Sequence, residues 1–469
     1  MAVVETETSP AQHFHWEPQP AAQTLIKELV ADFLERCPRV KELADRMLHE
    51  TATRFIDWID HIQAPRTLEL RERLLEVGFR HNPDPGASDR YTHPGAMFPQ
   101  VILVEGPMTR VGIKVDFVAD FLAAHMISND YPIYGDPFSP LRMAPAFRGN
   151  NAELWVVERQ GYQGFAVPES DAQRTVRAIK ALESFRRRER NWPTDEQGFQ
   201  RVNSLIDAAI ANLGPDQTCA LFFMAERDYW QRRNRAGQIQ YERQNRLGLG
   251  WGNHHHHTFR SSRENFPRLI AVLEKLGFRC RERFYAGHEA GWGAQVLEQP
   301  NAGITIFADV DLSPDEVAGD FAHEPVLTPR KELGTIGLWV GLHGESMLQA
   351  GMHHLECQFD FDALRAQLAA AHVGTMKPFT NMPHLRQAFT EGERWAVSEE
   401  RIQRLLEAGY ITQQQAMNFR MDGAIGSHLE NLERNDGFKG FNQQAVSDII
   451  ARTDPRKASP TGTPQVIGA

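Results

Sequence analysis

A short sequence motif occurs twice in this chain and sets limits on its fold. Residues 74–80 read LLEVGFR, and residues 272–279 read VLEKLGFR. Both end a segment whose apolar residues recur at helical spacing, and both place glycine where a helix terminates in left-handed backbone. A histidine-bearing segment precedes each copy, with His61 in the first and the run HHHH at 254–257 in the second. The pattern predicts an internal repeat whose period is too long for a solenoid.

Segments with the composition of β-strands follow each copy of the motif. Residues 99–105 (PQVILVE) come after the first copy, and residues 293–300 (GAQVLEQP) and 303–311 (GITIFADVD) come after the second. Apolar runs of this length between turn residues favour strands. We therefore expect an α+β fold of pseudo-symmetric β-α-β-β modules, with a helical insert between the halves and a helical C-terminal region.

Periodicity and composition also divide the chain into segments. The ends are polar and rich in proline, which is typical of disordered tails, and the stretches between the histidine segments and after them have helical spacing. The expected organisation is a disordered tail at 1–20, a helical lead-in and first half at 21–165, a helical connector at 166–247, a second half with the metal site at 248–372, a helical C-terminal region at 373–452 and a disordered tail at 453–469.

Overall composition excludes several classes of function. The chain has 469 residues and a net charge of −10, whereas a general nucleic-acid binder normally carries a basic excess. Its four cysteines are far apart, which is typical of a reducing compartment rather than of a disulfide framework. No segment approaches the ~18–20 apolar residues of a membrane span, and the N-terminus has no signal-peptide pattern. We expect a cytoplasmic protein without nucleic-acid or membrane partners, of undetermined oligomeric state.

The histidine segments are the candidate metal ligands. Side chains alternate along a strand, so His254 and His256 share one face while His255 and His257 share the other. Two equivalent strands that face each other across a pseudo-two-fold axis would bring His61 and one histidine of the run to one point. A carboxylate from another strand would complete a two-histidine, one-carboxylate set and leave coordination positions open. Which histidine of 254–257 binds stays open at this level.

Several carboxylates could complete that set. The first choice is Glu356, within the strand-like run at 352–359 (MHHLECQF), where it shares a face with His354. Asp309 and Asp311 in the FADVD segment, and Glu345 after His343-Gly344, are the rivals. A salt-bridged or edge-exposed carboxylate is an equally good interpretation of Glu356.

Two arginines follow the candidate ligands and could bind an acidic substrate. Arg66 comes shortly after His61, and Arg260 comes four residues after His256. A guanidinium can bind a carboxylate through two parallel hydrogen bonds. No G-x-S-x-G, Walker A, G-x-G-x-x-G or H-E-x-x-H pattern is present, so nucleophilic and nucleotide-binding motifs give no competing prediction.

The text around Asp60-His61 and residues 253–260 resembles the vicinal-oxygen-chelate superfamily, and within it the 2-oxoadipate dioxygenase/decarboxylase (hydroxyglutarate synthase) family. The shared order runs from a helical lead-in through an Asp-His strand, a Pro-x-Val strand, a helical insert, a second His strand and a carboxylate strand, with an Asp-Gly-Phe element like residues 436–438. By position, His61 matches the first ligand of that family and His256, through its His-x-x-x-Arg spacing to Arg260, the second. Glu356 matches the third ligand at a longer spacing, and Arg66 lies one residue late.

The resemblance implies a metal-dependent oxidoreductase. It would use Fe(II), with Zn, Mn or Ni as other possible metals, bind a small 2-oxo acid and dioxygen, and couple decarboxylation to hydroxylation, as in conversion of 2-oxoadipate to 2-hydroxyglutarate. Two other functions stay open: a metal-dependent lyase or isomerase of the glyoxalase type, and a small-ligand-binding protein without catalysis.

Overall fold

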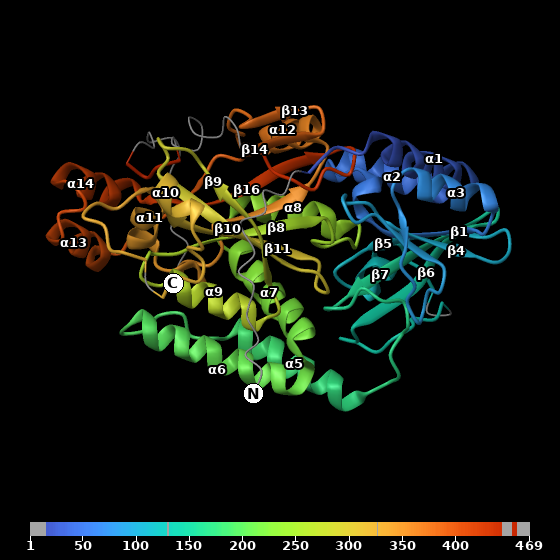
Figure 1. Cartoon of the computed structure of the whole chain (residues 1–469), viewed down its shortest axis with the longest axis horizontal. Coiled ribbons are helices and arrows are strands. Elements are labelled where there is room, and N and C mark those ends of the chain that lie inside the picture. The colour runs from blue at the N-terminus through green and yellow to red at the C-terminus, as the bar shows by residue number, and fades with distance from the viewer. Residues whose placement is uncertain (1–15, 129–130, 326, 443–452, 457–469) are drawn as a thin grey trace, which may run out of the picture.

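A computed structural model describes residues 16–128, 131–325, 327–442 and 453–456 of the chain. Within these residues the chain forms two separate β-sheets, each with helices around it (Figure 1). In that view the first sheet lies to the right and the second to the left. The α+β class expected from the sequence is confirmed.

Five helical segments and the first sheet make up the described N-terminal half. Pro20 and Pro38 each begin a helix, as suits a residue that lacks an N–H, so that α1 ends just before α2 starts. The helices are α1 (Pro20–Arg36), α2 (Pro38–Thr51), the short η1 (Phe55–Trp58), α3 (Leu68–Glu76) and α4 (Val118–Ala124). The strands are β1 (Ile59–Pro65), β2 (Arg80–His81), β3 (Arg90–Thr92), β4 (Gln100–Val104), β5 (Thr109–Lys114), β6 (Leu141–Gly149) and β7 (Ala152–Arg159).

The first sheet has the strand order β2-β3-β4-β1-β5-β7-β6. Strand β1 pairs in parallel with β4 and antiparallel with β5. Strand β4 is the last strand of the module that begins with β1, and β5 is the first strand of the next module. Two modules, β1-α3-β2-β3-β4 and β5-α4-β6-β7, therefore meet at their first strands.

Four helices form the expected helical insert. They are α5 (Ala172–Arg186), α6 (Asp195–Leu213), α7 (Pro215–Gln231) and α8 (Arg235–Arg246). Their buried side chains join the core beneath the second sheet, where Phe223 of α7 packs against Phe259 and Phe278. The insert is thus part of the hydrophobic core that supports the second sheet.

The second sheet repeats the arrangement of the first. Its order is β13-β14-β16-β12-β8-β11-β10-β9, with β15 pairing separately with β16. The strands are β8 (His254–Arg260), β9 (Arg279–Tyr285), β10 (Trp292–Gln299), β11 (Ile304–Asp311), β12 (His354–Gln358), β13 (Thr380–Met382), β14 (Leu385–Phe389), β15 (Glu393–Trp395) and β16 (Ala424–Arg434). The helices are α9 (Phe266–Lys275), α10 (Pro314–Ala318), α11 (Thr335–His343), η2 (Ser346–Ala350), α12 (Phe361–Ala370), α13 (Glu399–Glu407) and α14 (Gln413–Asp422).

Strands β8 and β12 open the two modules of this sheet and lie side by side. β8 pairs in parallel with β11 and antiparallel with β12, and β12 pairs in parallel with β16. The repeat that the sequence indicates is real, since Gly78 and Gly277 both end their helices at positive φ, +96° and +88°. However, β1 and β8 belong to different sheets, and the strand that faces β8 is β12.

The expectation that residues 373–452 form a helical region needs correction. Residues 373–452 contain α13 and α14, but they also contain β13 to β16, so this stretch completes the second sheet instead of forming a helical region. The second half accordingly extends to Arg434, well past the expected boundary at 372. The alternation in β16 (AIGSHLENLER) was hidden because both of its faces are largely buried.

Most of the two expected tails lies outside the described residues. Of the first tail, residues 16–19 are described, and the backbone N–H of Gln19 donates to the carbonyl of Asp436 at 2.7 Å. Of the second, residues 453–456 are described, and Asp454 is buried there. These short pieces are packed against the second half, contrary to the expected disorder.

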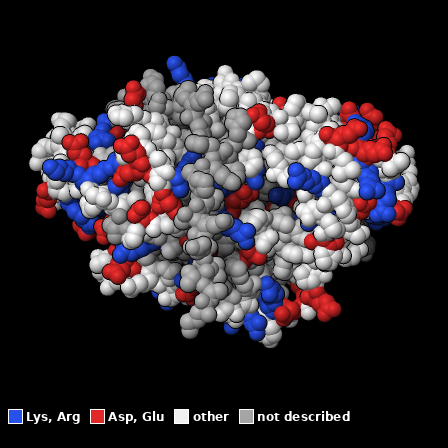
Figure 2. Space-filling model, viewed as in Figure 1, with Lys and Arg blue, Asp and Glu red and all other residues white. Residues whose placement is uncertain are grey.

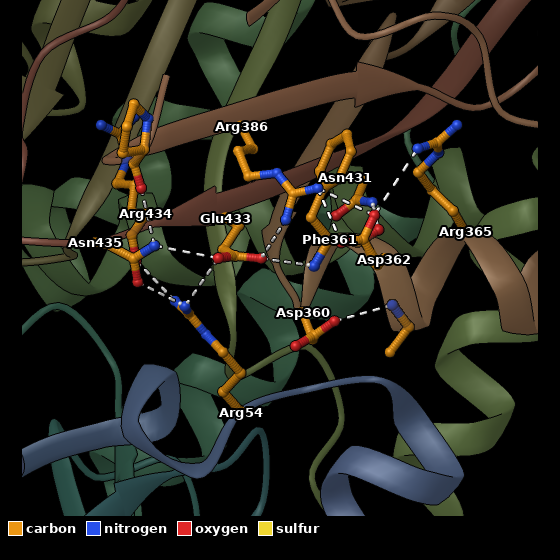
Figure 3. A network of polar contacts seen from close by, with 12 residues as sticks. Arg54, Asp360, Phe361, Asp362, Arg365, Arg386, Asn431, Glu433, Arg434 and Asn435 are labelled. Atoms are coloured by element: carbon orange, nitrogen blue, oxygen red, sulfur yellow. Dashed lines mark hydrogen bonds and ion pairs between the residues drawn. The ribbon is translucent and has the colours of Figure 1, made fainter. Parts of the chain in front are cut away.

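Arg54 joins the two halves at the end of β16 (Figure 3). Its guanidinium donates to Oδ1 of Asn435 at 2.8 Å and to the backbone carbonyl of Arg434 at 2.7 Å, and lies 3.5 Å from the Glu433 carboxylate. The same guanidinium binds both oxygens of Asp57 at 2.7 Å. One side chain thereby fixes the start of the first sheet to the last strand of the second.

Surface charge and helix composition add little to the fold. On the face in Figure 2, Lys and Arg side chains are interspersed with Asp and Glu. No helix in the described part of the chain combines the length and the apolarity that crossing a bilayer requires.

Candidate metal centre

The pairing of three central strands brings the candidate ligands together. His256 of β8 is the register partner of Glu356 on β12, and Glu356 is the partner of Glu430 on β16. Partners across a sheet project from the same face. Two residues before Glu356, His354 is the partner of Thr258 and shares that face.

His256, His354 and Glu430 form a compact cluster of donor atoms, which we call the metal cluster. Nε2 of His354 lies 2.9 Å from Oε2 of Glu430, and Nε2 of His256 lies 3.5 Å from the same oxygen. The three ligand atoms lie within 4.8 Å of one another, and all three residues are buried. Thr258 adds a hydroxyl 2.7 Å from Nε2 of His354.

A small apolar pocket adjoins the metal cluster. Its volume is about 50 Å³, and most of its wall is aromatic. The lining residues are His256, Thr258, Phe284, Trp292, Phe307, Asp309, His354, Phe379, Gln387, Phe389, Glu430, Phe441 and Asn442. Such a wall excludes water and strengthens every electrostatic interaction at the cluster.

Behind the cluster, a second carboxylate contacts the other nitrogen of His256. Oε1 of Glu356 lies 2.8 Å from Nδ1 of His256 and 2.9 Å from Nδ1 of His255. The amide of Gln387 donates to Glu356 at 3.0 Å and to Glu430 at 3.2 Å. A carboxylate on the remote nitrogen of a histidine fixes the ring orientation and raises its basicity, which is a common outer contact of metal ligands.

These contacts shift the acid–base properties of the group. Burial lowers the pKa of His256, but Glu356 and then Glu430 outweigh burial and raise it to about 9. Burial raises the pKa of Glu356, but His256 and His255 outweigh it and hold that pKa well below its usual range. Burial and the positive charge of Arg434 lower the pKa of His255 to about 3. Ionised Glu356 therefore lies beside His256, which stays protonated until a cation replaces the proton.

A second buried group, made of His255, His256 and Glu356, also has three donor atoms within 4.8 Å. It would use Nδ1 of two adjacent histidines and a carboxylate that is 0% exposed. Glu356 itself lines none of the described pockets, while His255 lines a cavity between the two sheets and His256 lines the apolar pocket. All three residues of the metal cluster, by contrast, line the apolar pocket. Two imidazoles and one carboxylate suit Fe(II), Zn(II) or Mn(II), so its donor set fits a divalent metal.

The structure does not bring His61 to this cluster. His61 is the third residue of β1, as His256 is of β8, but its register partners are Gln100 and Gly112 in the first sheet. Its Nδ1 lies 2.8 Å from Asp60, whose carboxylate is bound by Arg159 at 2.6 and 2.8 Å. The strand opposite His61 thus carries glycine where the strand opposite His256 carries Glu356.

Of the four carboxylate candidates, only Glu356 contacts His256, through the nitrogen that points away from the pocket. Asp309 lines the pocket but lies 3.7 Å from Arg260. Asp311 accepts backbone N–H groups at the start of α11, from Gly334, Ile336 and Gly337. Glu345 accepts hydrogen bonds from Ser261, Ser262 and Asn265, which lead into α9. The last two carboxylates hold helix starts in place.

The two arginines differ in their surroundings. Arg66 is half exposed and pairs with Asp89 and Glu105 on the outside of the first sheet. Arg260 is buried, lies over the ring of Trp339 and approaches Asp309. Arg66 is therefore placed away from the metal cluster, whereas Arg260 adjoins its pocket through Asp309.

Sequence reasoning missed His354 and Glu430 as first-choice ligands. His354 lies in the same strand-like run, 352–359, as Glu356. It becomes a candidate ligand once β12 is recognised as the first strand of a module. Glu430 lies in the stretch interpreted as helical. An alternation of small or apolar residues with His428 and Glu430 was the available signal, and it requires recognising β16 as a strand.

No protein-family model matches the sequence, and no curated protein matches it. Among solved structures, a 4-hydroxymandelate synthase mutant from Streptomyces coelicolor is 11% identical, with 73% of this chain and 96% of that chain covered and a TM-score of 0.29. A putative glyoxalase superfamily protein from Ralstonia eutropha JMP134 is 11% identical, with 57% and 97% covered and a TM-score of 0.31. A methylmalonyl-CoA epimerase from Mycobacterium tuberculosis is 14% identical, with 39% and 88% covered and a TM-score of 0.23. Likenesses this distant carry no argument about the reaction.

Proposed function

We propose that this protein is a metal-dependent oxygenase that binds Fe(II) through His256, His354 and Glu430 and acts on a small 2-oxo acid. The observation that carries the proposal is the arrangement of two histidines and one carboxylate on one face of a sheet, open to a pocket with an aromatic wall. This ligand set leaves coordination positions for a substrate and for dioxygen.

The contacts of each side chain indicate its role in the proposed reaction. When bound, the metal would chelate the 2-oxo acid and activate dioxygen. His256, His354 and Glu430 hold it, while Glu356 and Gln387 fix the orientation of His256 and Glu430. Phe307, Phe389 and their aromatic neighbours exclude water. Decarboxylation with hydroxylation of the remaining carbon chain, as for 2-oxoadipate, is the reaction that we propose to test first.

One observation favours a second candidate, a lyase or isomerase of the glyoxalase type that uses the metal as a Lewis acid. Asp309 lines the pocket, and its Oδ1 is buried with no hydrogen-bond partner among the described residues. Burial raises the pKa of Asp309 to about 8, despite Arg260 beside it. A carboxyl group with a pKa near neutrality can exchange protons with a bound substrate, which is what such a reaction requires.

The first experiment is to measure the metal content of protein purified without chelators or metal-affinity resin, and then oxygen uptake with Fe(II) and a panel of 2-oxo acids. We expect one metal ion per chain and uptake that depends on one of these acids. The variant His354→Ala should lose both, whereas the matched variant His61→Ala should keep the metal, since His61 lies in the other sheet.

Each other result has a definite meaning. Metal binding with turnover but no oxygen uptake would replace the oxygenase by the lyase or isomerase. Metal loss in His61→Ala together with retention in His354→Ala would show that the ligand set is wrong. Absence of any stoichiometric metal, and of any stabilisation by added metal, would leave a binding protein without metal chemistry.

A further inference from the structure

A large cavity lies between the two sheets, apart from the metal cluster. Its volume is about 650 Å³, which is within the roughly 300–1,000 Å³ range of small-molecule sites. Residues of the first sheet and of α1 line one side, and residues of β8 to β12 and the end of β16 line the other. We call this cavity the inter-sheet chamber.

The chamber and the metal pocket are separate spaces. Among the described residues, none lines both. Phe441 stands between them, because it lines the metal pocket while its ring lies 4.9 Å from the guanidinium of Arg434 and 5.5 Å from that of Arg281. Both of these arginines line the chamber. A ligand in the chamber therefore needs no contact with the metal.

Basic residues outnumber acidic residues in the lining of the chamber, although the chain as a whole is negative. Five basic residues line it (Arg90, Lys114, Arg281, Arg434 and Lys439), against three acidic ones (Asp57, Asp60 and Glu298). Two of the three acids are already neutralised by arginines outside the lining, since Arg54 binds Asp57 and Arg159 binds Asp60. The remaining acid, Glu298, lies 3.3 Å from Lys439 and 3.7 Å from Arg281. Two of the lining arginines have acidic partners outside the lining, since Arg281 pairs with Glu282 and Arg90 lies 3.9 Å from Asp84. Lys114, Arg434 and Lys439 therefore carry the excess positive charge.

Two of the cations lack the partners that buried charges normally have. Arg434 is 5% exposed, and its Nε and Nη2 are buried with no hydrogen-bond partner among the described residues. Its Nη1 donates to the carbonyls of Phe438 and Gly440, which fixes the guanidinium in place. Lys114 is half-buried, and the acidic group near it, Asp60, is already bound by Arg159. A buried cation whose donors lack partners, such as Arg434, is costly unless a ligand supplies the opposite charge.

The rest of the lining suits an organic molecule better than a bare ion. Ile26, Ile56, Ile59 and Phe98 offer apolar surface, while Gln100 and the other amides of the lining offer hydrogen bonds. The wall that carries Arg434 is held rigidly, because Arg54 from the other half binds its backbone carbonyl (Figure 3). A preformed cavity with fixed cations and an apolar portion is the usual form of a site for a small organic acid.

We propose that the inter-sheet chamber is a second binding site, independent of the metal cluster, for a small organic anion that bears a carboxylate or a phosphate group. The basic lining holds the anionic group, and the apolar side of the chamber holds the carbon skeleton.

Calorimetric titration of the full-length, chelator-treated protein tests this proposal. The probes are glutarate, inorganic phosphate and the neutral glutaramide. We expect saturable binding of glutarate or phosphate, with the tighter of the two identifying the anionic group, and no binding of glutaramide. Lys114→Met removes one charge with little change of shape and should weaken binding roughly tenfold, the effect of one lost charge-assisted contact.

Three controls make the result decisive. Lys180→Met removes an exposed lysine of α5 outside the chamber and should bind as the unaltered protein does. Lys439→Gln provides a second chamber variant in case Lys114→Met is unstable, and it should also weaken binding. His354→Ala should bind the anion normally, so that loss of the metal and loss of the anion are separable.

Two outcomes would overturn the proposal. One is the absence of saturable binding for both anions, or binding that Lys114→Met and Lys439→Gln leave unchanged. The other is binding that appears only after Mn(II) is added back to the chelator-treated protein and that His354→Ala abolishes, which would place the anion at the metal cluster. A metal-binding protein with no anion binding would refute the chamber site and leave the proposed oxygenase intact.

Discussion

Each imidazole nitrogen of His256 faces a different carboxylate, and this decides what each carboxylate can do. Glu430 lies on the Nε2 side, together with His354 and the apolar pocket, while Glu356 lies on the Nδ1 side, together with His255. Both acids come from strands next to each other in the sheet, so sequence position alone does not separate the ligand from the residue that orients it.

The first prediction concerns Glu356. The variant Glu356→Gln keeps the shape of the side chain and removes its charge, so His256 loses the partner that raises its basicity. We expect metal affinity to fall by about 10–100-fold, the usual cost of losing such an outer contact, measured by competition with a chelator of known affinity. Glu345→Gln, another buried carboxylate of the same half, should leave the affinity unchanged. Complete loss of metal in Glu356→Gln would instead make Glu356 a ligand.

The second prediction concerns pH. In the metal-free protein, the contacts with Glu356 and Glu430 raise the pKa of His256 to about 9, so a metal ion must displace a proton at neutral pH. Apparent metal affinity should therefore rise about tenfold per pH unit from pH ~7 to ~9 and then level off. Calorimetry in buffers of different ionisation enthalpy should show release of one proton. A flat profile would contradict the assignment of His256.

The raised pKa of His256 also makes the free energy of unfolding of the metal-free protein depend on pH. The folded-state pKa of His256, about 9, lies above its unfolded value of ~6.5. Its stabilising effect is therefore fully present below pH ~6.5 and is lost as the pH rises through about 9. Unfolding of the metal-free protein in urea at a series of pH values should show this decline, and His256→Gln should lack it.

At the scale of elements, two strands of like design have different neighbours. β1 and β8 both place a histidine third and both precede a helix that ends in Gly-Phe-Arg. β5 offers Gly112 opposite His61, whereas β12 offers Glu356 opposite His256. The local sequence specifies the strand and its helix, but the pairing partner specifies the chemistry.

The third prediction concerns the contact between elements at Arg54. Removing its guanidinium in Arg54→Gln would leave the buried Asp57 and the nearby Glu433 without their cation. We expect the free energy of unfolding to fall by about 2–4 kcal/mol, as for the loss of one partner of a largely buried ion pair. Arg46→Gln, which breaks the exposed pair with Glu50, should change it by less than about 0.5 kcal/mol. Equal effects in urea titrations would show that the Arg54 network does not join the halves.

In the whole molecule, the two halves have different roles. The first sheet has no described group of three metal-ligating side chains, while the second has both buried groups. Contacts from Arg54 and from the segment at Gln19 tie the first half to the end of β16. The first half thereby forms one side of the inter-sheet chamber and supports the strand that carries Glu430.

The fourth prediction follows from these ties. A metal ion that binds only the folded protein stabilises it by about 2.7 kcal/mol at one hundred times its dissociation constant. If the halves unfold together, Mn(II) should shift a single calorimetric transition upward as a whole, and His354→Ala should abolish the shift. Two transitions, of which only one responds to Mn(II), would show that the halves unfold separately.

The α+β class, the helix ends at Gly78 and Gly277, the helical insert, and the importance of β8 and of the run at 352–359 all follow from the amino-acid sequence. These depend on local periodicity and on backbone conformations that a few residue types prefer, so they can be recognised along the chain. The three-dimensional fold was needed to show that His354 and Glu430 line one pocket with His256, and that His61 lies in the other sheet. Ligand geometry depends on which strands pair and in what register, and pairing is set by packing between segments far apart in sequence, which leaves no local signal.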